Sequence, residues 1–173
     1  GDYIKTIAYL PGGAPVDVAE LGYFLTLLAV VGLINAFNMM DGIDGLAAMQ
    51  AILSIILTTI SIYIFGGNYA SDFFVIILLG ALIGFLIVNL SLLPKIKVFL
   101  GDAGSMLVGF YVAWILITNT QNQGGEGLPP SMALWIVAVP VTDTLSLSVR
   151  RIRLRRSPFS PDRKHLHHIS LRL

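Results

Sequence analysis

Residues 35–45, NAFNMMDGIDG, place two Asn, two Asp and two Gly between two long apolar runs. The runs, residues 21–37 and 46–65, contain no charged residue, and each is close to the roughly 20 residues that a helix needs to cross a bilayer. A charge at the bilayer centre costs about 2.5 to 3.5 kcal/mol on insertion scales, so we expect Asp41 and Asp44 to occupy a hydrated, functional position. The pattern predicts membrane-spanning helices joined by a loop that carries part of an active site.

The composition of the whole chain agrees with this interpretation. It is 55% hydrophobic, has a mean hydropathy of +0.81 and contains 12% charged residues, against roughly 25% in an average soluble domain. We therefore predict an all-α integral membrane protein with about five transmembrane helices in this chain, as part of a larger multi-span bundle. The expected spans are 21–37, 46–65, 73–93, 106–118 and 131–149, preceded by an extramembrane lead-in (1–20) and followed by a basic, His-containing tail (150–173).

The distribution of Lys and Arg predicts the orientation of these spans. Lys95 and Lys97 follow the third span and eight more basic residues follow the fifth, whereas the loops at 66–72 and 119–130 contain none. Because short basic loops stay in the cytoplasm, the 94–104 loop is expected there. Counting spans back places the 38–45 loop on the same side, and counting forward adds the tail. All three polar segments are therefore expected to share the cytoplasmic face.

Asp41 and Asp44 are three residues apart, and Asn35 and Asn38 repeat that spacing one and two turns earlier. If a helix continues through this stretch, the four polar side chains share one face. Gly42 and Gly45 have no side chains, which lets a bulky polar ligand approach the backbone. The alternative is a helix cap in which one Asp binds free backbone N–H groups. Two Asp and two Asn together in a membrane protein favour the site.

The second polar segment, VFLGDAGS at 98–105, places Asp102 at the mouth of an apolar helix. The chain has no Cys, so a metal would need oxygen or imidazole ligands. Mg²⁺ is held by one or two carboxylates together with phosphate oxygens and water, which suits Asp102. Ser105 can supply a hydroxyl, and Phe99 can stack on a planar base. The alternatives are an N-cap role for Asp102 and an interfacial anchor role for Phe99.

The tail combines several arginines with the sequence HLHH. Basic residues after a last span are usually anchors on the cytoplasmic side, and this explains most of the arginines, although we include Arg153 among the substrate-binding candidates. His165, His167 and His168 do not have the HExxH spacing of zinc proteases. Imidazoles can donate hydrogen bonds to phosphate oxygens, so we interpret these histidines as pyrophosphate contacts.

The three motifs NAFNMMDGIDG, VFLGDAGS and SPFSPDRKHLHH, in this order, resemble the polyprenyl-phosphate N-acetylhexosamine-1-phosphate transferases. The HLHH ending is most similar to the bacterial undecaprenyl-phosphate GlcNAc-1-phosphate transferases that begin O-antigen, enterobacterial common antigen or teichoic acid synthesis, and it differs from the HHH of the MurNAc-pentapeptide branch. The resemblance implies transfer of GlcNAc-1-phosphate from UDP-GlcNAc to undecaprenyl phosphate, with release of UMP. It also implies Mg²⁺, or alternatively Mn²⁺, at the cytoplasmic face of the bacterial inner membrane.

The resemblance further implies a role for each motif residue. Asp41, Asp44 and Asp102 would be the catalytic residues. Asp102 would be the main metal ligand, Asp41 would also contact the metal, and Asn38 would line the metal and the diphosphate. Asp44 and Phe99 would hold the uridine. The remaining substrate-binding candidates are Asn35, Asn89 near the nucleotide, Arg153, and the donor-contacting His165, His167 and His168.

Two features of the family have no counterpart here, namely an Asp-Asp pair on an earlier helix and a total of about ten spans. We therefore expect the chain to be an internal or C-terminally cut portion of a larger enzyme that is inactive alone. Another UDP-N-acetylhexosamine is an alternative donor, a homodimer is a candidate assembly, and no nucleic-acid partner is indicated.

Two readings from other classes compete with the enzyme. A membrane transporter module would use Asp and Asn near the bilayer midplane, reached from both sides. A structural subunit would leave the GDAGS and HLHH clusters unexplained. Asp143, inside the fifth expected span, is either functional or part of a buried polar pair between helices.

Overall fold

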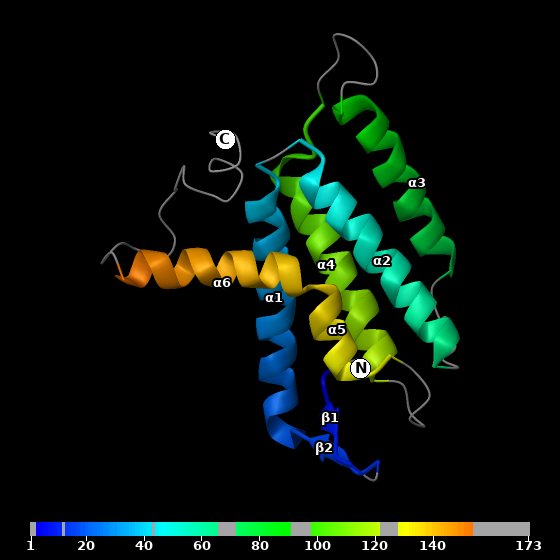
Figure 1. Ribbon diagram of the computed structural model, residues 1–173, viewed down its shortest axis with the longest axis vertical. Coiled ribbons are helices and arrows are strands. Elements are labelled where there is room, and N and C mark those ends of the chain that lie inside the picture. The colour runs from blue at the N-terminus through cyan, green and yellow to red at the C-terminus, as the bar shows by residue number, and fades with distance from the viewer. Residues whose placement is uncertain are drawn as a thin grey trace.

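The computed structural model describes residues 3–11, 13–42, 44–65, 72–90, 98–121 and 128–153, and most of them are helical (Figure 1). The helices α1, α2 and α4 are long and apolar enough to cross a membrane, the apolar part of α3 is slightly shorter, and the bent pair α5–α6 would add one more span if counted together. The helical membrane fold predicted from the sequence is thus confirmed. The helix bounds are α1 Gly22–Met40, α2 Leu46–Ile64, α3 Asp72–Asn89, α4 Gly101–Thr120, α5 Pro130–Ile136 and α6 Ala138–Arg153.

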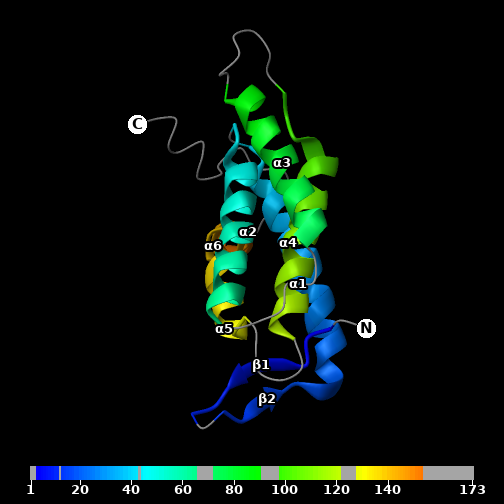
Figure 2. The ribbon, with the colours of Figure 1, turned by 90° about the vertical axis from the view of Figure 1, so that its right-hand side faces the viewer.

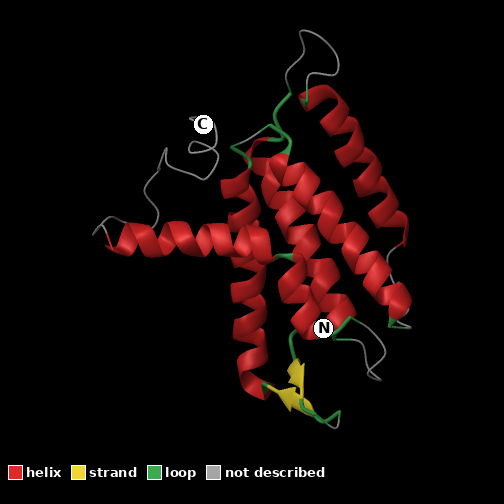
Figure 3. Cartoon of the chain, viewed as in Figure 1, coloured by secondary structure: helices red, strands yellow, loops and turns green. Residues whose placement is uncertain are grey.

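The lead-in before α1 contains a small antiparallel sheet, which an all-α prediction did not anticipate (Figure 3). Strand β1 (Thr6–Tyr9) pairs with β2 (Pro15–Asp17), and Gly13 turns the chain between them with a φ of +85° that favours glycine. A short 3₁₀ helix, η1 (Ala19–Leu21), then leads into α1. The hairpin lies at the end of the bundle where α1 begins.

The packing of α1 against α4 organises the bundle. Gly109 of α4 meets the backbone of α1, since an added Cβ would lie 2.9 Å from both Ile34 Cα and Leu33 O. Small residues of this kind let membrane helices approach closely. The antiparallel pair then brings the end of α1 and the start of α4, which carry the first two polar motifs, to the end of the bundle opposite the hairpin (Figures 1 and 2).

Helix α2 completes the core on one side and separates α4 from part of α3. Its first turns bury Ala47, Ala48 and Ala51, all at 0% exposure. Helix α3 packs mainly on α2 and lies at the edge of the bundle (Figure 1). Outward-facing residues such as Leu27 and Tyr63 are 62% and 89% exposed, which suits a lipid environment better than water.

The fifth expected span, 131–149, is not one straight helix, because α5 and α6 are bent by 69° around Val137. Helix α6 lies across α1 instead of continuing along the bundle (Figure 1). Pro140 accounts for the break, since proline has no N–H to donate to the carbonyl four residues earlier and its ring crowds that carbonyl. Two other bounds differ as well, because α3 ends at Asn89 and α4 begins at Gly101 rather than at Met106.

Candidate active site at the carboxylate end of the bundle

The first motif is split between a helix and a turn. Helix α1 ends at Met40 and α2 begins at Leu46, so Asp41 and Asp44 lie in the connecting turn. The expectation that they share a face of one helix with the two Asn residues is therefore wrong. The physical reason is Gly45, which has a φ of +77° and reverses the chain where a continuous helix would need a negative φ.

Gly45 also leaves room for the end of α3. An added Cβ would lie 2.9 Å from Leu86 Cδ2 and 3.4 Å from Asn89 Oδ1. Asn89 is 2% exposed, and its Nδ2 donates a hydrogen bond of 2.6 Å to the carbonyl oxygen of Val98. Its Oδ1 has no hydrogen-bond partner among the described residues. Asn89 thus links the turn after α1 to the segment that carries Phe99.

Asp41 joins the first motif to the second. Its carboxylate accepts a hydrogen bond from the backbone N–H of Gly101, the first residue of α4. The N-cap residue of α4, Leu100, supplies no such bond from its own side chain. Asp41 therefore satisfies one of the free N–H groups at the start of α4 from the end of another helix. The local cap alternative is not seen at this turn, because the N-cap of α2 is Gly45 and no side chain caps it, and the backbone donor that Asp41 binds belongs to α4. Asp102 is not an N-cap either, since it lies inside the first turn of α4.

The surroundings of Asp41 disfavour its charge. Burial raises the pKa of the Asp41 carboxyl, the hydrogen bond from Gly101 opposes that rise, and the nearby charge of Asp102 adds to it. Asp102, which is exposed in the first turn of α4, thus places a second negative charge near the partly buried carboxyl of Asp41. A cation between them would relieve this repulsion.

A side-chain hydrogen bond fixes the two helices next to these carboxylates. Ser105 Oγ donates to Asn38 Oδ1 over 2.9 Å, and Ser105 is 0% exposed. The same Oγ lies 3.1 Å from the carbonyl oxygens of Gly101 and Asp102. The sequence analysis named Ser105 as a possible source of a hydroxyl in GDAGS but did not include it among the candidate site residues.

The remaining candidates lie outside this group of contacts. Asn35 is exposed, and its Nδ2 donates to the carbonyl oxygen of Val31 on its own helix over 3.0 Å. Asp44 is exposed in the turn, and Phe99 is 69% exposed just before α4. Arg153 is exposed at the end of α6. The candidates His165, His167 and His168 lie outside the described residues.

The residues at this end fit a hard divalent cation. The described part of the chain contains no group of three or more His, Cys, Asp or Glu side chains that could hold a metal by themselves. Mg²⁺ does not need such a group, because it is usually bound by one or two carboxylates while substrate phosphates and water complete its shell. Asp41 and Asp102 supply two carboxylates, so this end of the bundle suits a metal that binds together with a phosphorylated ligand.

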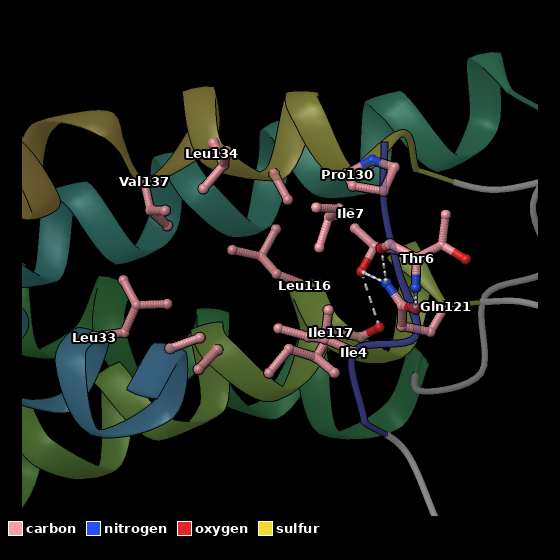
Figure 4. A pocket seen from close by; sticks show the side chains of 14 residues that line it. Ile4, Thr6, Ile7, Leu33, Leu116, Ile117, Gln121, Pro130, Leu134 and Val137 are labelled. Atoms are coloured by element: carbon pink, nitrogen blue, oxygen red, sulfur yellow. Dashed lines mark hydrogen bonds between the residues drawn. The ribbon is translucent and has the colours of Figure 1, made fainter. Parts of the chain in front are cut away.

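A cavity of about 170 Å³ lies elsewhere, between the hairpin, α1, α4 and α5 (Figure 4). Its lining contains no charged residue. Gln121 at its edge already binds the backbone of β1, accepting from Lys5 N–H at 2.8 Å and Thr6 N–H at 3.0 Å and donating to Thr6 O at 3.1 Å. The cavity offers nothing to neutralise a phosphate, so it does not compete with the carboxylate end as a site for an anionic substrate.

The chain is thus a helical membrane protein with two neighbouring carboxylates, Asp41 and Asp102, at one end of its bundle. Within that class, the chain belongs to glycosyl transferase family 4, whose sequence model matches residues 4–120. The family expected from the three motifs is thereby confirmed.

Curated relatives share one name, undecaprenyl-phosphate alpha-N-acetylglucosaminyl 1-phosphate transferase. The protein from Escherichia coli (strain K12) is 40% identical over 171 residues, which cover 98% of this chain and 46% of the relative. The Yersinia pestis protein is 39% identical over 99% of this chain and 47% of its own length. The Haemophilus influenzae protein is 45% identical over 55% of this chain and 27% of its own length. The chain thus spans about half the length of the first two relatives.

Proposed function

We propose that this chain forms the carboxylate-bearing part of an enzyme that transfers GlcNAc-1-phosphate from UDP-GlcNAc to undecaprenyl phosphate. The observation that carries the proposal is the contact of Asp41 with Gly101 beside Asp102, because it joins two polar motifs at one end of a membrane bundle. Membership of glycosyl transferase family 4 and the name shared by the relatives support the same reaction.

The proposed reaction conserves atoms without an oxidant or a protein nucleophile. A phosphate oxygen of the lipid attacks the phosphorus that bears the sugar, the bond to the bridging oxygen of the diphosphate breaks, and UMP leaves with that oxygen. Phosphoryl transfer of this kind depends mainly on positioning and on neutralising negative charge. Mg²⁺, or Mn²⁺ in its place, would supply the neutralising charge when bound by Asp102 and Asp41.

The other side chains of the chain have roles in binding and orientation. Asn38 is held by Ser105 next to the carboxylates, where it lines the diphosphate. Phe99 is largely exposed and available to stack on uracil, and Asp44, exposed in the turn after α1, would also hold the uridine. Asn35, Asn89, Arg153, His165, His167 and His168 complete the proposed set of substrate-binding residues.

Localisation follows from the same proposal. The soluble nucleotide sugar and the basic loops belong on the cytoplasmic side of the bacterial inner membrane, so the carboxylate end faces the cytoplasm. The product would begin O-antigen, enterobacterial common antigen or teichoic acid synthesis. Another UDP-N-acetylhexosamine remains the alternative donor, and a homodimer the candidate assembly.

The experiment uses the full-length protein in bilayers with undecaprenyl phosphate and UDP-GlcNAc. We expect lipid-linked GlcNAc and UMP to form in equal amounts, only when the lipid phosphate and a divalent cation are both present. A parallel assay with sealed liposomes tests the transporter alternative by following ion or sugar uptake. Uptake without UMP release would refute the proposed enzyme and favour the transporter. Equal rates with another UDP-N-acetylhexosamine would correct the donor only.

A further inference from the structure

Two buried polar side chains of α2 lie apart from the carboxylate end. Gln50 is 9% exposed and Ser54 is 1% exposed. Gln50 Nε2 lies 3.4 Å from the carbonyl oxygen of Ile136, and Ser54 Oγ lies 3.5 Å from the same oxygen. The two side chains are also 3.5 Å from each other. Both donors of α2 therefore converge on one carbonyl of another helix, the last residue of α5.

The sequence explains why this carbonyl needs donors. In a continuous helix it would accept a hydrogen bond from the N–H four residues later, but that residue is Pro140, which has none. Pro140 is also fully buried, so water does not replace the missing donor there. Inside a membrane bundle, freed carbonyls are satisfied by side chains of neighbouring helices. Gln50 and Ser54 fulfil this requirement at the 69° bend between α5 and α6.

We propose that Gln50 and Ser54 are positioning residues that hold the α5–α6 break in its bent form and thereby fix the direction of α6. Helix α6 crosses α1 and carries Arg153 at its end (Figure 1). If the proposed function holds, the bend between α5 and α6 thereby sets the position of the substrate-binding candidate Arg153 relative to Asp41 and Asp102.

Thr58, a neighbouring residue of α2, shows that not every buried polar side chain of this helix contacts the carbonyl oxygen of Ile136. Thr58 is as buried as Ser54, at 1% exposure, and lies one turn later on α2. Its Oγ1 donates over 2.7 Å to the carbonyl oxygen of Ser54, within its own helix. A hydroxyl of α2 can thus be satisfied locally, whereas Gln50 and Ser54 contact the break. Thr58→Val is the matched control, because it removes a buried hydroxyl whose hydrogen bond lies within α2.

The first test measures the direction of α6 in the full-length protein. This chain has no Cys, so spin labels can be placed at Ser146→Cys on α6 and Tyr63→Cys at the far end of α2, both exposed, once any Cys elsewhere is replaced. In Gln50→Met with Ser54→Ala, we expect the distance distribution between the labels to shift or broaden. The control should keep the native distribution. An unchanged distribution in the double variant would overturn the proposal.

Pro140→Ala gives a second test, which separates the loss of donors to the carbonyl oxygen of Ile136 from the general effect of two core substitutions. Alanine restores the N–H that can bind the carbonyl oxygen of Ile136, so the Gln50 and Ser54 donors become less necessary. In the Pro140→Ala background, the double substitution should change the label distances less than it does with Pro140 present. An equal or larger change would show that the two side chains do not act through this carbonyl.

Kinetics then separate this inference from the proposed function. In the double variant we expect kcat/KM for UDP-GlcNAc to fall about 10- to 100-fold, since misplacement by an ångström can cost that much, while the Mg²⁺ requirement stays unchanged. A native kcat/KM together with altered label distances would overturn the positioning role. If wild-type protein shows no transfer, the proposed function fails, and the label distances still decide whether Gln50 and Ser54 hold the break.

Discussion

The carboxylate of Asp41 makes a contact that supports the fold, although its surroundings disfavour its negative charge. Its carboxylate accepts the N–H of Gly101, yet burial and Asp102 both raise its pKa. A residue that served stability alone would not be placed beside a second carboxylate, because removing either charge would relieve the repulsion. The arrangement is typical of a site whose cost to the free protein is offset by a bound cation.

Replacing Asp41 by Asn should separate these two effects. A raised pKa means that the folded protein binds the proton more tightly than the unfolded chain, so the ionised carboxyl lowers stability at pH values above its usual range. Asn keeps the acceptor for Gly101. In EDTA at pH 7 we expect the Tm of Asp41→Asn to be about 2 °C higher than that of the wild type. The expected change is small because removing a partly exposed charge alters the free energy of unfolding by less than about 1 kcal/mol.

The Tm difference between Asp41→Asn and wild type should shrink as pH falls from 7 towards 4, because protonation removes the same charge. Thermal unfolding in detergent at several pH values measures it. Transfer activity should fall in the same variant. A lower Tm for Asp41→Asn at every pH would show that the carboxylate is stabilising and is not held against an electrostatic cost.

Asp102→Asn tests the proposed metal ligand. Asn has nearly the same size and would suit a helix terminus almost as well, but it lacks the charge that Mg²⁺ requires. In the full-length enzyme we expect turnover to fall by about 10² to 10³, comparable to the loss of a major electrostatic group, and the residual activity to need more Mg²⁺. Glu20→Gln, exposed at the hairpin end, is the matched control. UMP release at the wild-type rate under limiting Mg²⁺ would remove Asp102 from the metal site.

At the scale of secondary-structure elements, one side chain attaches the hairpin to the bundle. Gln121 follows α4 and pairs with β1 as a neighbouring strand would, through three hydrogen bonds to Lys5 and Thr6. Edge strands expose unpaired backbone groups, and Gln121 satisfies some of these groups on β1. The hairpin also covers one side of the apolar cavity in Figure 4.

Gln121→Leu should therefore loosen the hairpin without unfolding the helices. Each lost hydrogen bond removes about 1 kcal/mol, so the backbone amides of Lys5 and Thr6 should exchange at least about 10-fold faster with deuterium. Thr118→Val is the control, since its hydroxyl binds carbonyls of its own helix at 2.9 and 3.1 Å. Unchanged exchange at Thr6 in Gln121→Leu would show that other contacts hold the hairpin.

In the molecule as a whole, the polar segments gather at the two opposite ends of the helix bundle. The carboxylate turn and the start of α4 lie at one end, and the hairpin with the start of α5 lies at the other (Figures 1 and 2). This arrangement agrees with the orientation predicted from Lys and Arg, in which the two ends face opposite sides of the membrane.

Single-Cys labelling in a Cys-free background tests this orientation. Gly42 and Glu20 are exposed at opposite ends, so Gly42→Cys and Glu20→Cys provide one reporter for each. A membrane-impermeant maleimide should label Glu20→Cys in intact cells and Gly42→Cys only in inverted vesicles. Labelling of both from the same side, or of Gly42→Cys from outside, would contradict the predicted topology.

The helical membrane class, the family and the separate polar motifs could all be predicted from the amino-acid sequence. Runs of about 20 apolar residues have few alternatives in lipid, because every backbone group must be satisfied internally. Asp41 and Asp102 were predicted as site residues because carboxylates, amides and glycines cluster beside apolar runs, and because the motifs resemble those of a known family. These features are local, so they can be predicted from composition and spacing.

The contacts between those segments could not be predicted from the sequence and are seen in the three-dimensional structure. The contact of Asp41 with Gly101, the bond from Ser105 to Asn38, and the two donors on the carbonyl of Ile136 each join residues at least 60 positions apart or on different helices. The turn at Gly45 and the break before Pro140 are visible in the sequence as Gly and Pro, but their directions depend on which neighbouring side chains supply room or hydrogen bonds. Such partners are chosen by packing, which no single segment of the sequence specifies.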